Sequence, residues 1–217
     1  MRRRPFSSPA LVLASALTVV VLAAGCAPSQ SSAASPSSVT AASDAVGTSS
    51  ASAADAGPAW ALDFAGSGER IKSAGLQILD AEGTVEHYHA HLDIFVDGNK
   101  VAVPANIGFA VDASGQATGI SALHTHDTSG VVHIEAATAG KKYILGQLLT
   151  EWGVLGTDGS IGGKTGRGDQ GWHLVVNGAK DDADPTSLTL RAHQEIALVY
   201  GKDPASIPAS FDFPAGE

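Results

Sequence analysis

Alternating apolar and polar positions predict a β-strand over residues 84–96. Its even positions from Tyr88 to Val96 are apolar or aromatic, whereas its odd positions carry His87, His89, His91 and Asp93. Successive side chains on a strand point to opposite faces. The three histidines and the aspartate are therefore expected on one face, and the apolar residues on the other.

A hairpin turn is predicted directly after this strand. Residues 97–100 read Asp-Gly-Asn-Lys, and an Asp-Gly pair is typical of a tight turn between antiparallel strands. Val101 and Val103 are then expected opposite Val96 and Ile94, on the apolar face.

A second hairpin is predicted further along the chain. Two alternating segments, 120–126 and 131–137, flank a turn of Asp, Thr, Ser and Gly. Antiparallel pairing across this turn places His124 opposite His133. The polar face of the hairpin is expected to hold four side chains: His124, His126, His133 and Glu135.

Apolar positions spaced by three and four predict a helix over residues 143–152, with Gly153 placed to end it. A short helix over 67–74 and strands over 172–176 and 195–200 complete the expected elements. The fold class is therefore α+β, with a small mixed or antiparallel sheet and one main helix packed on it. If both hairpins join this sheet, their histidine faces are expected on the side that the helix leaves uncovered.

Composition narrows the possible partners. The 217 residues include 22 acidic and 13 basic side chains, for a net charge of −9. This balance argues against nucleic-acid binding, which needs clustered Lys and Arg to displace counterions. The single cysteine excludes an internal disulfide and a thiolate cluster, which leaves the eight histidines as the unusual feature.

The N-terminus is typical of an export signal. Three arginines at positions 2–4 precede an uncharged apolar stretch, and residues 22–26 read Leu-Ala-Ala-Gly-Cys. This ending resembles the lipobox of bacterial lipoproteins. The resemblance implies removal of residues 1–25 and a lipid on Cys26 that holds the protein on the outer face of the cytoplasmic membrane. An ordinary secretory signal is the alternative, and residues 3–6 also resemble the twin-arginine signature, so the export route stays open.

The rest of the chain divides by composition. Residues 26–58 are rich in Ser and Ala and contain no Lys or Arg, which predicts a disordered spacer behind the lipidated cysteine. Residues 59–203 are expected to form a single globular, histidine-rich domain. Residues 204–217, which include three prolines, are expected to form an irregular tail.

Two further resemblances concern the folded part. Residues 131–201, with a Val-Asn-Gly turn and a Glu-Ile-Ala-Leu-Val ending, resemble the β-grasp fold of the ubiquitin-like sulfur carriers. This resemblance implies a β-grasp-like fold but not sulfur transfer, because those carriers end in Gly-Gly and this chain ends in Phe-Pro-Ala-Gly-Glu. Residues 86–200 are similar to uncharacterised secreted and lipid-anchored proteins that share His-x-His-x-His and Leu-His-Thr-His, a similarity that implies no activity.

The spacing of the histidines is suited to metal ligation. Histidines two residues apart on a strand stand about 6.6–6.8 Å apart, and both can lean onto one ion through bonds of about 2.0–2.1 Å. Imidazole with carboxylate suits copper(II) or zinc, and the lack of any methionine after Met1 disfavours copper(I). We therefore expect capture, buffering or delivery of copper(II) or zinc at the cell surface. The candidate ligands are His87, His89, His91, Asp93, His124, His126, His133 and Glu135.

Two other function classes stay open. A metalloenzyme would use the same histidines with an open coordination position and Glu135 or Asp93 as a proton shuttle. A β-grasp interaction module would carry histidines that respond to pH without a metal. The sequence contains no evident nucleophile or oxyanion donor, which favours metal binding without catalysis. His173 and His193 are assigned to structure or solvent.

Overall fold

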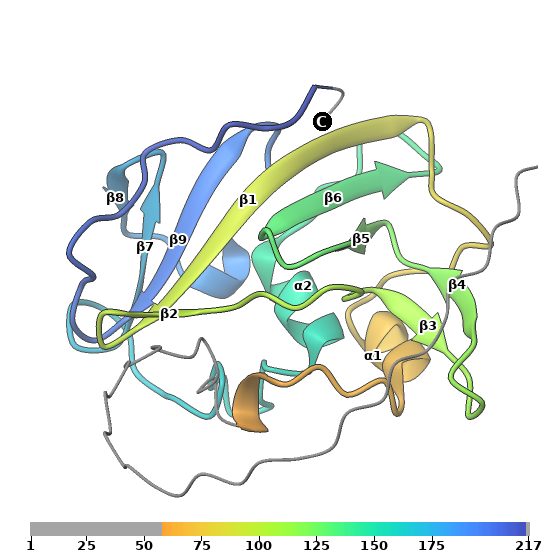
Figure 1. Ribbon diagram of the computed structural model, residues 1–217, viewed down its shortest axis with the longest axis horizontal. Coiled ribbons are helices and arrows are strands. Elements are labelled where there is room, and N and C mark those ends of the chain that lie inside the picture. The colour runs from red at the N-terminus through yellow and green to blue at the C-terminus, as the bar shows by residue number, and fades with distance from the viewer. Residues whose placement is uncertain (1–57, 216–217) are drawn as a thin grey trace, which may run out of the picture. The chain divides into compact units, whose positions relative to one another are not determined.

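The computed structural model describes residues 58–215 (Figure 1). The expected signal peptide, Cys26 and the expected spacer up to residue 57 lie outside the described residues. Within residues 58–215, no helix is long and apolar enough to cross a membrane. The elements follow in chain order: η1 (Pro58–Trp60), α1 (Ser67–Ser73), β1 (Glu86–Val96), β2 (Asn99–Val101), β3 (Phe109–Val111), β4 (Ala117–Ile120), β5 (Leu123–His124), β6 (Val131–Ala136), α2 (Leu145–Trp152), β7 (Trp172–Val176), β8 (Ala179–Asp181), η2 (Pro185–Ser187) and β9 (Gln194–Tyr200).

A seven-stranded sheet organises these elements. Its strands lie in the order β5-β6-β1-β9-β7-β8, and β2 pairs with the end of β1. β1 and β9 run parallel, whereas the other neighbouring strands run antiparallel. β3 and β4 form a separate two-stranded ribbon. The expected α+β class with a mixed, mostly antiparallel sheet is therefore confirmed.

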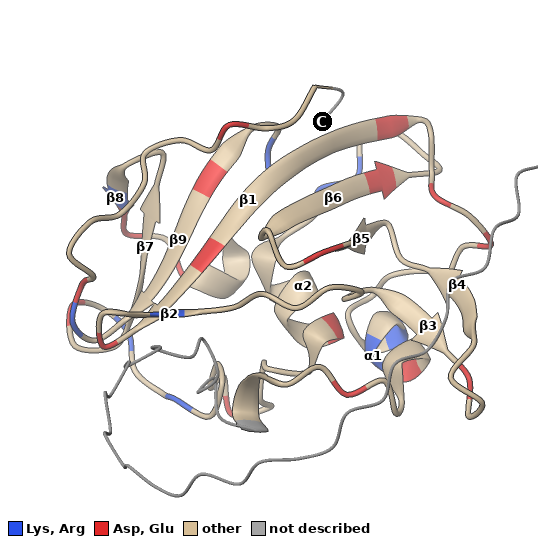
Figure 2. Cartoon of the chain, in the orientation of Figure 1, with Lys and Arg blue, Asp and Glu red and all other residues tan. Residues whose placement is uncertain are grey.

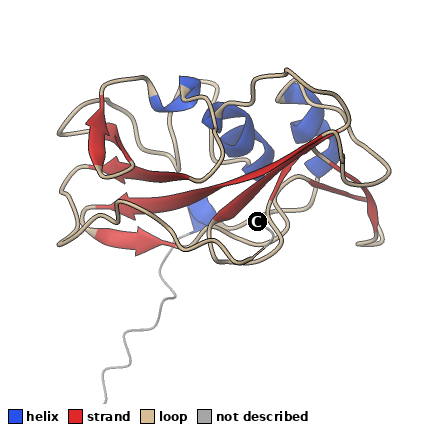
Figure 3. Cartoon of the chain, turned by 90° about the horizontal axis from the view of Figure 1, so that it is seen from above, coloured by secondary structure: helices blue, strands red, loops and turns tan. Residues whose placement is uncertain are grey.

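The helix α2 packs on the apolar face of the sheet, as its periodicity predicts. Both α-helices lie on one side of the sheet (Figure 3). Gly153 ends α2 with a φ of 88°, in the left-handed region that glycine adopts without steric cost. The core joins the even-numbered β1 residues Leu92 and Ile94 to the buried side chains of α2, Leu145, Leu148, Leu149 and Trp152.

The histidines of β1 lie on the face that α2 leaves uncovered, as expected, but most of this face is buried by another segment of the chain. His89, His91 and Asp93 are only 1%, 4% and 2% exposed. The C-terminal segment after β9 supplies cover on this face. Ile207 packs against a second apolar cluster there, and the ring of Phe211 stacks on that of His91 with centroids 3.9 Å apart.

The register of the first hairpin differs from expectation by two residues. Val101 pairs with Ile94 instead of Val96. Asp97 and Gly98 alone form the turn, with φ values of 49° and 85°, the positive values that a type I′ turn needs at both central positions. A shift of two residues preserves the alternation, and Val101 is therefore still buried on the apolar face.

The second hairpin has the expected register. His124 pairs with His133 and Leu123 with Ile134. β5 ends at His124, so His126 lies in the loop that follows. The two hairpins join through β6, which pairs with β5 on one edge and with β1 on the other.

Candidate metal centre

Three neighbouring strands of the sheet each carry a buried carboxylate, and acidic positions on all three are red in Figure 2. Glu135 on β6, Asp93 on β1 and Glu195 on β9 are 6%, 2% and 1% exposed. A carboxylate is rarely buried unless it is paired. The partners of these three side chains divide the histidines of β1 into two groups.

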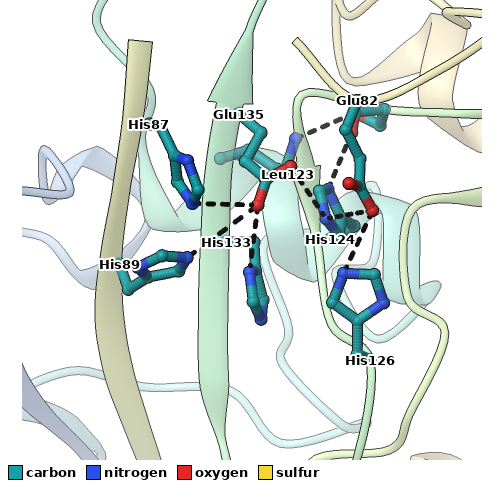
Figure 4. Close-up of polar contacts among 9 residues, drawn as sticks. Glu82, His87, His89, Leu123, His124, His126, His133 and Glu135 are labelled. Carbon is teal, nitrogen blue, oxygen red and sulfur yellow. Dashed lines mark hydrogen bonds and ion pairs between the residues drawn. The ribbon is translucent and has the colours of Figure 1, made fainter. Parts of the chain in front are cut away.

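The larger group forms where β6 lies between β1 and β5. Antiparallel pairing places His87 opposite Glu135, and His89 opposite His133. His133 is in turn opposite His124. The side chains therefore project from one patch of the sheet and point toward one another (Figure 4).

The carboxylate of Glu135 occupies the middle of this patch. Its Oε1 lies 3.3 Å from Nε2 of His87, 3.9 Å from Nε2 of His89 and 3.3 Å from Nδ1 of His133. Its Oε2 lies 4.0 Å from Nε2 of His124. The two oxygens of one carboxylate thus face different histidines.

Glu82 completes the group from the segment before β1. Its Oε1 lies 3.3 Å from Nε2 of His126 and 3.9 Å from Nε2 of His124. The next residue, Gly83, allows a close approach to β6, since a Cβ there would lie 2.1 Å from the carbonyl carbon of Ala136. Glu82 belongs to no periodic segment, so the sequence pattern did not identify it, and the adjacent glycine is its only local signal.

The imidazole rings of the group pack against one another. The ring of His133 lies 4.4 Å from that of His89 and 4.5 Å from that of His126, and it stacks on His124 at 5.2 Å with an interplanar angle of 11°. Phe109 of β3 presents its ring to His124 and His126 at 6.1 Å and 5.9 Å. This packing restricts the rings and preorganises their nitrogens. We use the name histidine cluster for His87, His89, His124, His126 and His133 together with Glu82 and Glu135.

His124 is neutral, and one of its nitrogens faces the cluster. Its Nδ1 lies 3.0 Å from the carbonyl oxygen of Ser121, and because a carbonyl only accepts, Nδ1 carries the proton. Nε2 therefore bears the lone pair, and it forms no hydrogen bond within the described residues. Burial chiefly lowers the pKa of His124 to about 3. A neutral imidazole with a free lone pair is the state that a metal ion requires.

The cluster also concentrates negative charge. Burial raises the pKa of Glu135, and the negative charge of Glu82 raises it as well. Among residues 58–215, the ion pairs of these two carboxylates are all with histidines. A bound cation would balance the negative charge of these two carboxylates.

One side of the cluster is open to solvent. The side chains of His87, His126 and Glu82 are 52%, 42% and 47% exposed, whereas His124 lies at the buried end. A cavity of about 440 Å³ adjoins the open side and is lined by residues that include Glu82 and Phe109. An ion therefore has a path from solvent to the buried nitrogens.

His91 and Asp93 lie outside the histidine cluster. Nδ1 of His91 is 2.8 Å from Oε2 of Glu195, and its Nε2 is 2.9 Å from the carbonyl oxygen of Ser129. Both partners accept, so the ring donates from both nitrogens and is protonated. Burial lowers the pKa of His91, but the hydrogen bond and the charge of Glu195 outweigh it and raise the pKa overall. Asp93 pairs with Nζ of Lys100 at 2.6 Å.

This second group therefore has a structural explanation. Donor atoms of His91, Asp93 and Glu195 lie within 4.8 Å of one another, which alone would permit a metal ion. A protonated imidazole offers no lone pair, however, and each of the two carboxylates already faces a cation. Glu195 lies on the apolar-rich last strand, where the sequence pattern does not distinguish it as a site residue.

His173 and His193 contact the C-terminal segment, in agreement with their assignment to structure. Nε2 of His173 lies 2.8 Å from Oδ1 of Asp203, and the ring of His193 lies 5.0 Å from that of Phe213. Within the described part of the chain, neither belongs to a group with metal-ligand spacing.

The structure thus brings six of the eight expected ligands together, adds Glu82, and sets His91 and Asp93 apart. Comparison of the chain with protein-family models, curated proteins and solved structures finds no match.

Proposed function

We propose that the protein binds a transition metal ion, copper(II) or zinc, through the histidine cluster. The observation that carries this proposal is the convergence of five imidazoles and two carboxylates, whose donor atoms fall into groups within 4.8 Å. Histidines gathered this closely would repel one another if they were protonated. A shared cation explains why they are kept together, partly buried and beside two carboxylates.

The donor set supports these two metals over others. Imidazole nitrogen with carboxylate oxygen is a common ligand set for zinc and for copper(II). Copper(I) prefers thiolate and thioether ligands, and the chain contains one cysteine, at position 26, and one methionine, at position 1. The exposed His87 and His126 also leave the site accessible for loading and release.

The proposed role is capture, buffering or delivery of the metal at the cell surface. Support for the location comes from the sequence, in which residues 1–25 resemble a lipoprotein signal and Cys26 is the expected lipid attachment point. The spacer predicted over residues 26–58 would separate the metal site from the outer face of the cytoplasmic membrane.

We assign the fold to the β-grasp type as part of the same proposal. The strand order β6-β1-β9-β7-β8, with β1 parallel to β9 and α2 connecting β6 to β7, supports this assignment. On this view the segment 97–130 is an insertion between the first two strands. The insertion carries His124 and His126 to the edge of the sheet.

Metal binding can be tested directly on the full chain. Elemental analysis after native purification is expected to find copper or zinc, and the chelator-treated protein is expected to take up either ion in a calorimetric titration. His126→Ala is expected to weaken binding at least tenfold without unfolding the protein, because this side chain is half exposed. His193→Asn is the matched control, since it removes an exposed histidine outside the cluster and Asn tolerates the φ of 55° there. A protein that is purified without metal and takes up neither ion contradicts the proposal.

A metalloenzyme is the second candidate, and one observation favours it. The cavity of about 440 Å³ beside Glu82 and Phe109 gives a small molecule room next to the exposed edge of the cluster. Glu135 is then the proton shuttle, whereas Asp93 is paired with Lys100 and lies outside the cluster. Hydrolysis of activated ester and phosphoester substrates by the zinc-loaded chain, lost in Glu135→Gln while zinc stays bound, would favour this candidate.

A further inference from the structure

The histidine cluster offers more ligands than one ion uses. Zinc in proteins is almost always four-coordinate, and a catalytic zinc ion usually has three protein ligands. The cluster holds five imidazoles and two carboxylates, all within reach of a neighbour in the set. One tetrahedral ion would leave several of these groups without a metal bond.

The donor atoms separate into two sets on the two sides of β6. His87 and His89 of β1 group with Glu135, whereas His124, His126 and His133 form a set of their own. No such group among the described residues joins a β1 histidine to His126. Since neighbouring strands lie about 4.8 Å apart, β1 and β5 are about 10 Å apart across β6. The two sets therefore have separate centres.

Glu135 connects the two sets through its two oxygens. Oε1 faces His87 and His89 on the β1 side, at 3.3 Å and 3.9 Å, and it also lies 3.3 Å from Nδ1 of His133 on β6 itself. Oε2 faces His124 on the β5 side, at 4.0 Å. A third group of donor atoms, from Glu82, His124 and Glu135, overlaps the other two and makes the cluster continuous.

From this arrangement we infer that the cluster holds two metal ions bridged by the carboxylate of Glu135, an inference that rests on the proposed function. One ion takes His87, His89 and Oε1 of Glu135. The other takes Oε2 of Glu135 with His124, His126 and His133. Two-metal sites in proteins hold their ions about 3.5–4 Å apart, which suits bridging by one carboxylate.

The two positions differ in their ligands. The position on the β5 side has three imidazoles, one of them the buried His124, and Glu82 lies 3.3 Å from His126 as a further oxygen donor. The position on the β1 side has two imidazoles, and His87 is 52% exposed. We expect the β5-side position to fill first, and the β1-side ion to be the more weakly held.

The test is metal stoichiometry combined with copper(II) electron paramagnetic resonance on the full chain. Wild type is expected to bind two ions in two steps. At saturation with copper(II), its resonance intensity is expected to fall below the copper content and to include a half-field transition, because two neighbouring ions couple magnetically. His193→Asn, which removes a histidine outside the cluster, is the control and is expected to match wild type.

Three variants separate the two positions. His87→Ala and His126→Ala change half-exposed side chains, so both are expected to fold, with circular dichroism as the check. Each is expected to lower the affinity for one of the two ions by 100-fold or more and to remove the coupled signal. Glu135→Gln, which removes the negative charge of the bridge, is expected to abolish the coupling while at least one ion still binds.

Two results would overturn the two-ion centre while leaving metal binding intact. One is saturation at a single ion per chain whose affinity falls in both His87→Ala and His126→Ala. The other is two ions whose resonance is uncoupled and unaffected by Glu135→Gln. Failure of wild type to bind either copper(II) or zinc would instead reject the proposed function itself.

Discussion

Glu151 on α2 carries a buried carboxyl group, and its replacement by glutamine tests whether burial keeps this group uncharged in the folded protein. The residue is 2% exposed, and neither carboxyl oxygen forms a hydrogen bond of normal geometry within the described residues. Burial raises the pKa of Glu151 to about 8, and the nearby Ser121 hydroxyl and Lys141 charge offset this only in part. At neutral pH the folded protein therefore keeps this carboxyl group protonated.

The loss of folding stability with rising pH follows from the pKa values of Glu151 in the unfolded and the folded protein. In the unfolded chain the group ionises near its ordinary pKa of 4.5, whereas in the folded protein it ionises near 8. Between these values the folded state holds a proton that the unfolded state has lost, so stability falls by about 1.36 kcal/mol for each pH unit above 4.5. At pH 7 the accumulated loss is about 3 kcal/mol, and it stops growing once the pH passes the folded pKa.

Glu151→Gln keeps the shape of the protonated acid and removes the titration. The amide introduces donors that also need partners, and this cost is the same at every pH. The free energy of unfolding of the variant minus that of wild type is therefore expected to rise by about 3 kcal/mol from pH 4 to pH 7. Urea unfolding followed by the fluorescence of the buried tryptophans measures this difference.

Glu69→Gln is the matched control because Glu69 lies on α1 with its side chain 79% exposed. The free energy of unfolding of Glu69→Gln minus that of wild type is expected to change by less than about 0.5 kcal/mol over the same pH range. If Glu151→Gln shows the same small change, the carboxyl group is ionised in the folded protein, and the reasoning from its burial is refuted.

Three further predictions concern the histidines and their supports. Gly108→Ala is expected to lower the free energy of unfolding by about 1–3 kcal/mol and to weaken zinc binding, because the new Cβ would lie 2.1 Å from the carbonyl oxygen of Leu123, next to His124; unchanged zinc affinity in a calorimetric titration would contradict this. Because the pKa of His91 is raised, its pairing with Glu195 contributes stability that is present below pH 6.5 and is lost as the pH rises through the folded pKa. Glu195→Gln is therefore expected to lower the free energy of unfolding, measured with urea, more at pH 5.5 than at pH 9. An equal decrease at both pH values would argue against this contribution of the His91–Glu195 pair. Zinc affinity of the cluster is expected to fall as the pH is lowered, because protons compete with the metal ion for imidazole nitrogen, and a competition titration with a chelating dye can measure this fall; an affinity that stays constant down to pH 5 would contradict imidazole ligation.

Periodicity predicted the strands and the face of the sheet on which their side chains lie, because both depend on local geometry. The alternation along residues 120–126 and 131–137, with the turn between them, was sufficient to place His124 opposite His133. The same reasoning misplaced Val101 by two residues. Asp97 and Gly98 alone form the turn, so strand pairing begins at Asn99 and Val101 pairs with Ile94 instead of Val96.

Periodicity could not predict which segment covers the histidine face of β1, or which residues from other parts of the chain contact the histidines. Nothing in the alternation of β1 reveals that the C-terminal segment lies over its odd-numbered face and brings Phe211 onto His91. Glu82 reaches the histidine cluster from an irregular segment, and Glu195 reaches His91 from a parallel strand more than a hundred residues away in the chain. Such contacts depend on the tertiary fold, for which a single sequence holds no periodic signal.

Strand geometry, by contrast, explains why the three histidines of the His-x-His-x-His row cannot all bind one metal ion. Neighbours on one face stand about 6.6–6.8 Å apart, so the outer two histidines are about 13 Å apart, too far for bonds of about 2 Å to a single ion. At most two adjacent members can share a metal, and the strands beside β1 decide which two. His87 and His89 face Glu135 of β6, whereas His91 faces Glu195 of β9, whose charge favours the protonated ring. The same three residues therefore serve two purposes, with two of them available as metal ligands and the third fixing β1 to β9.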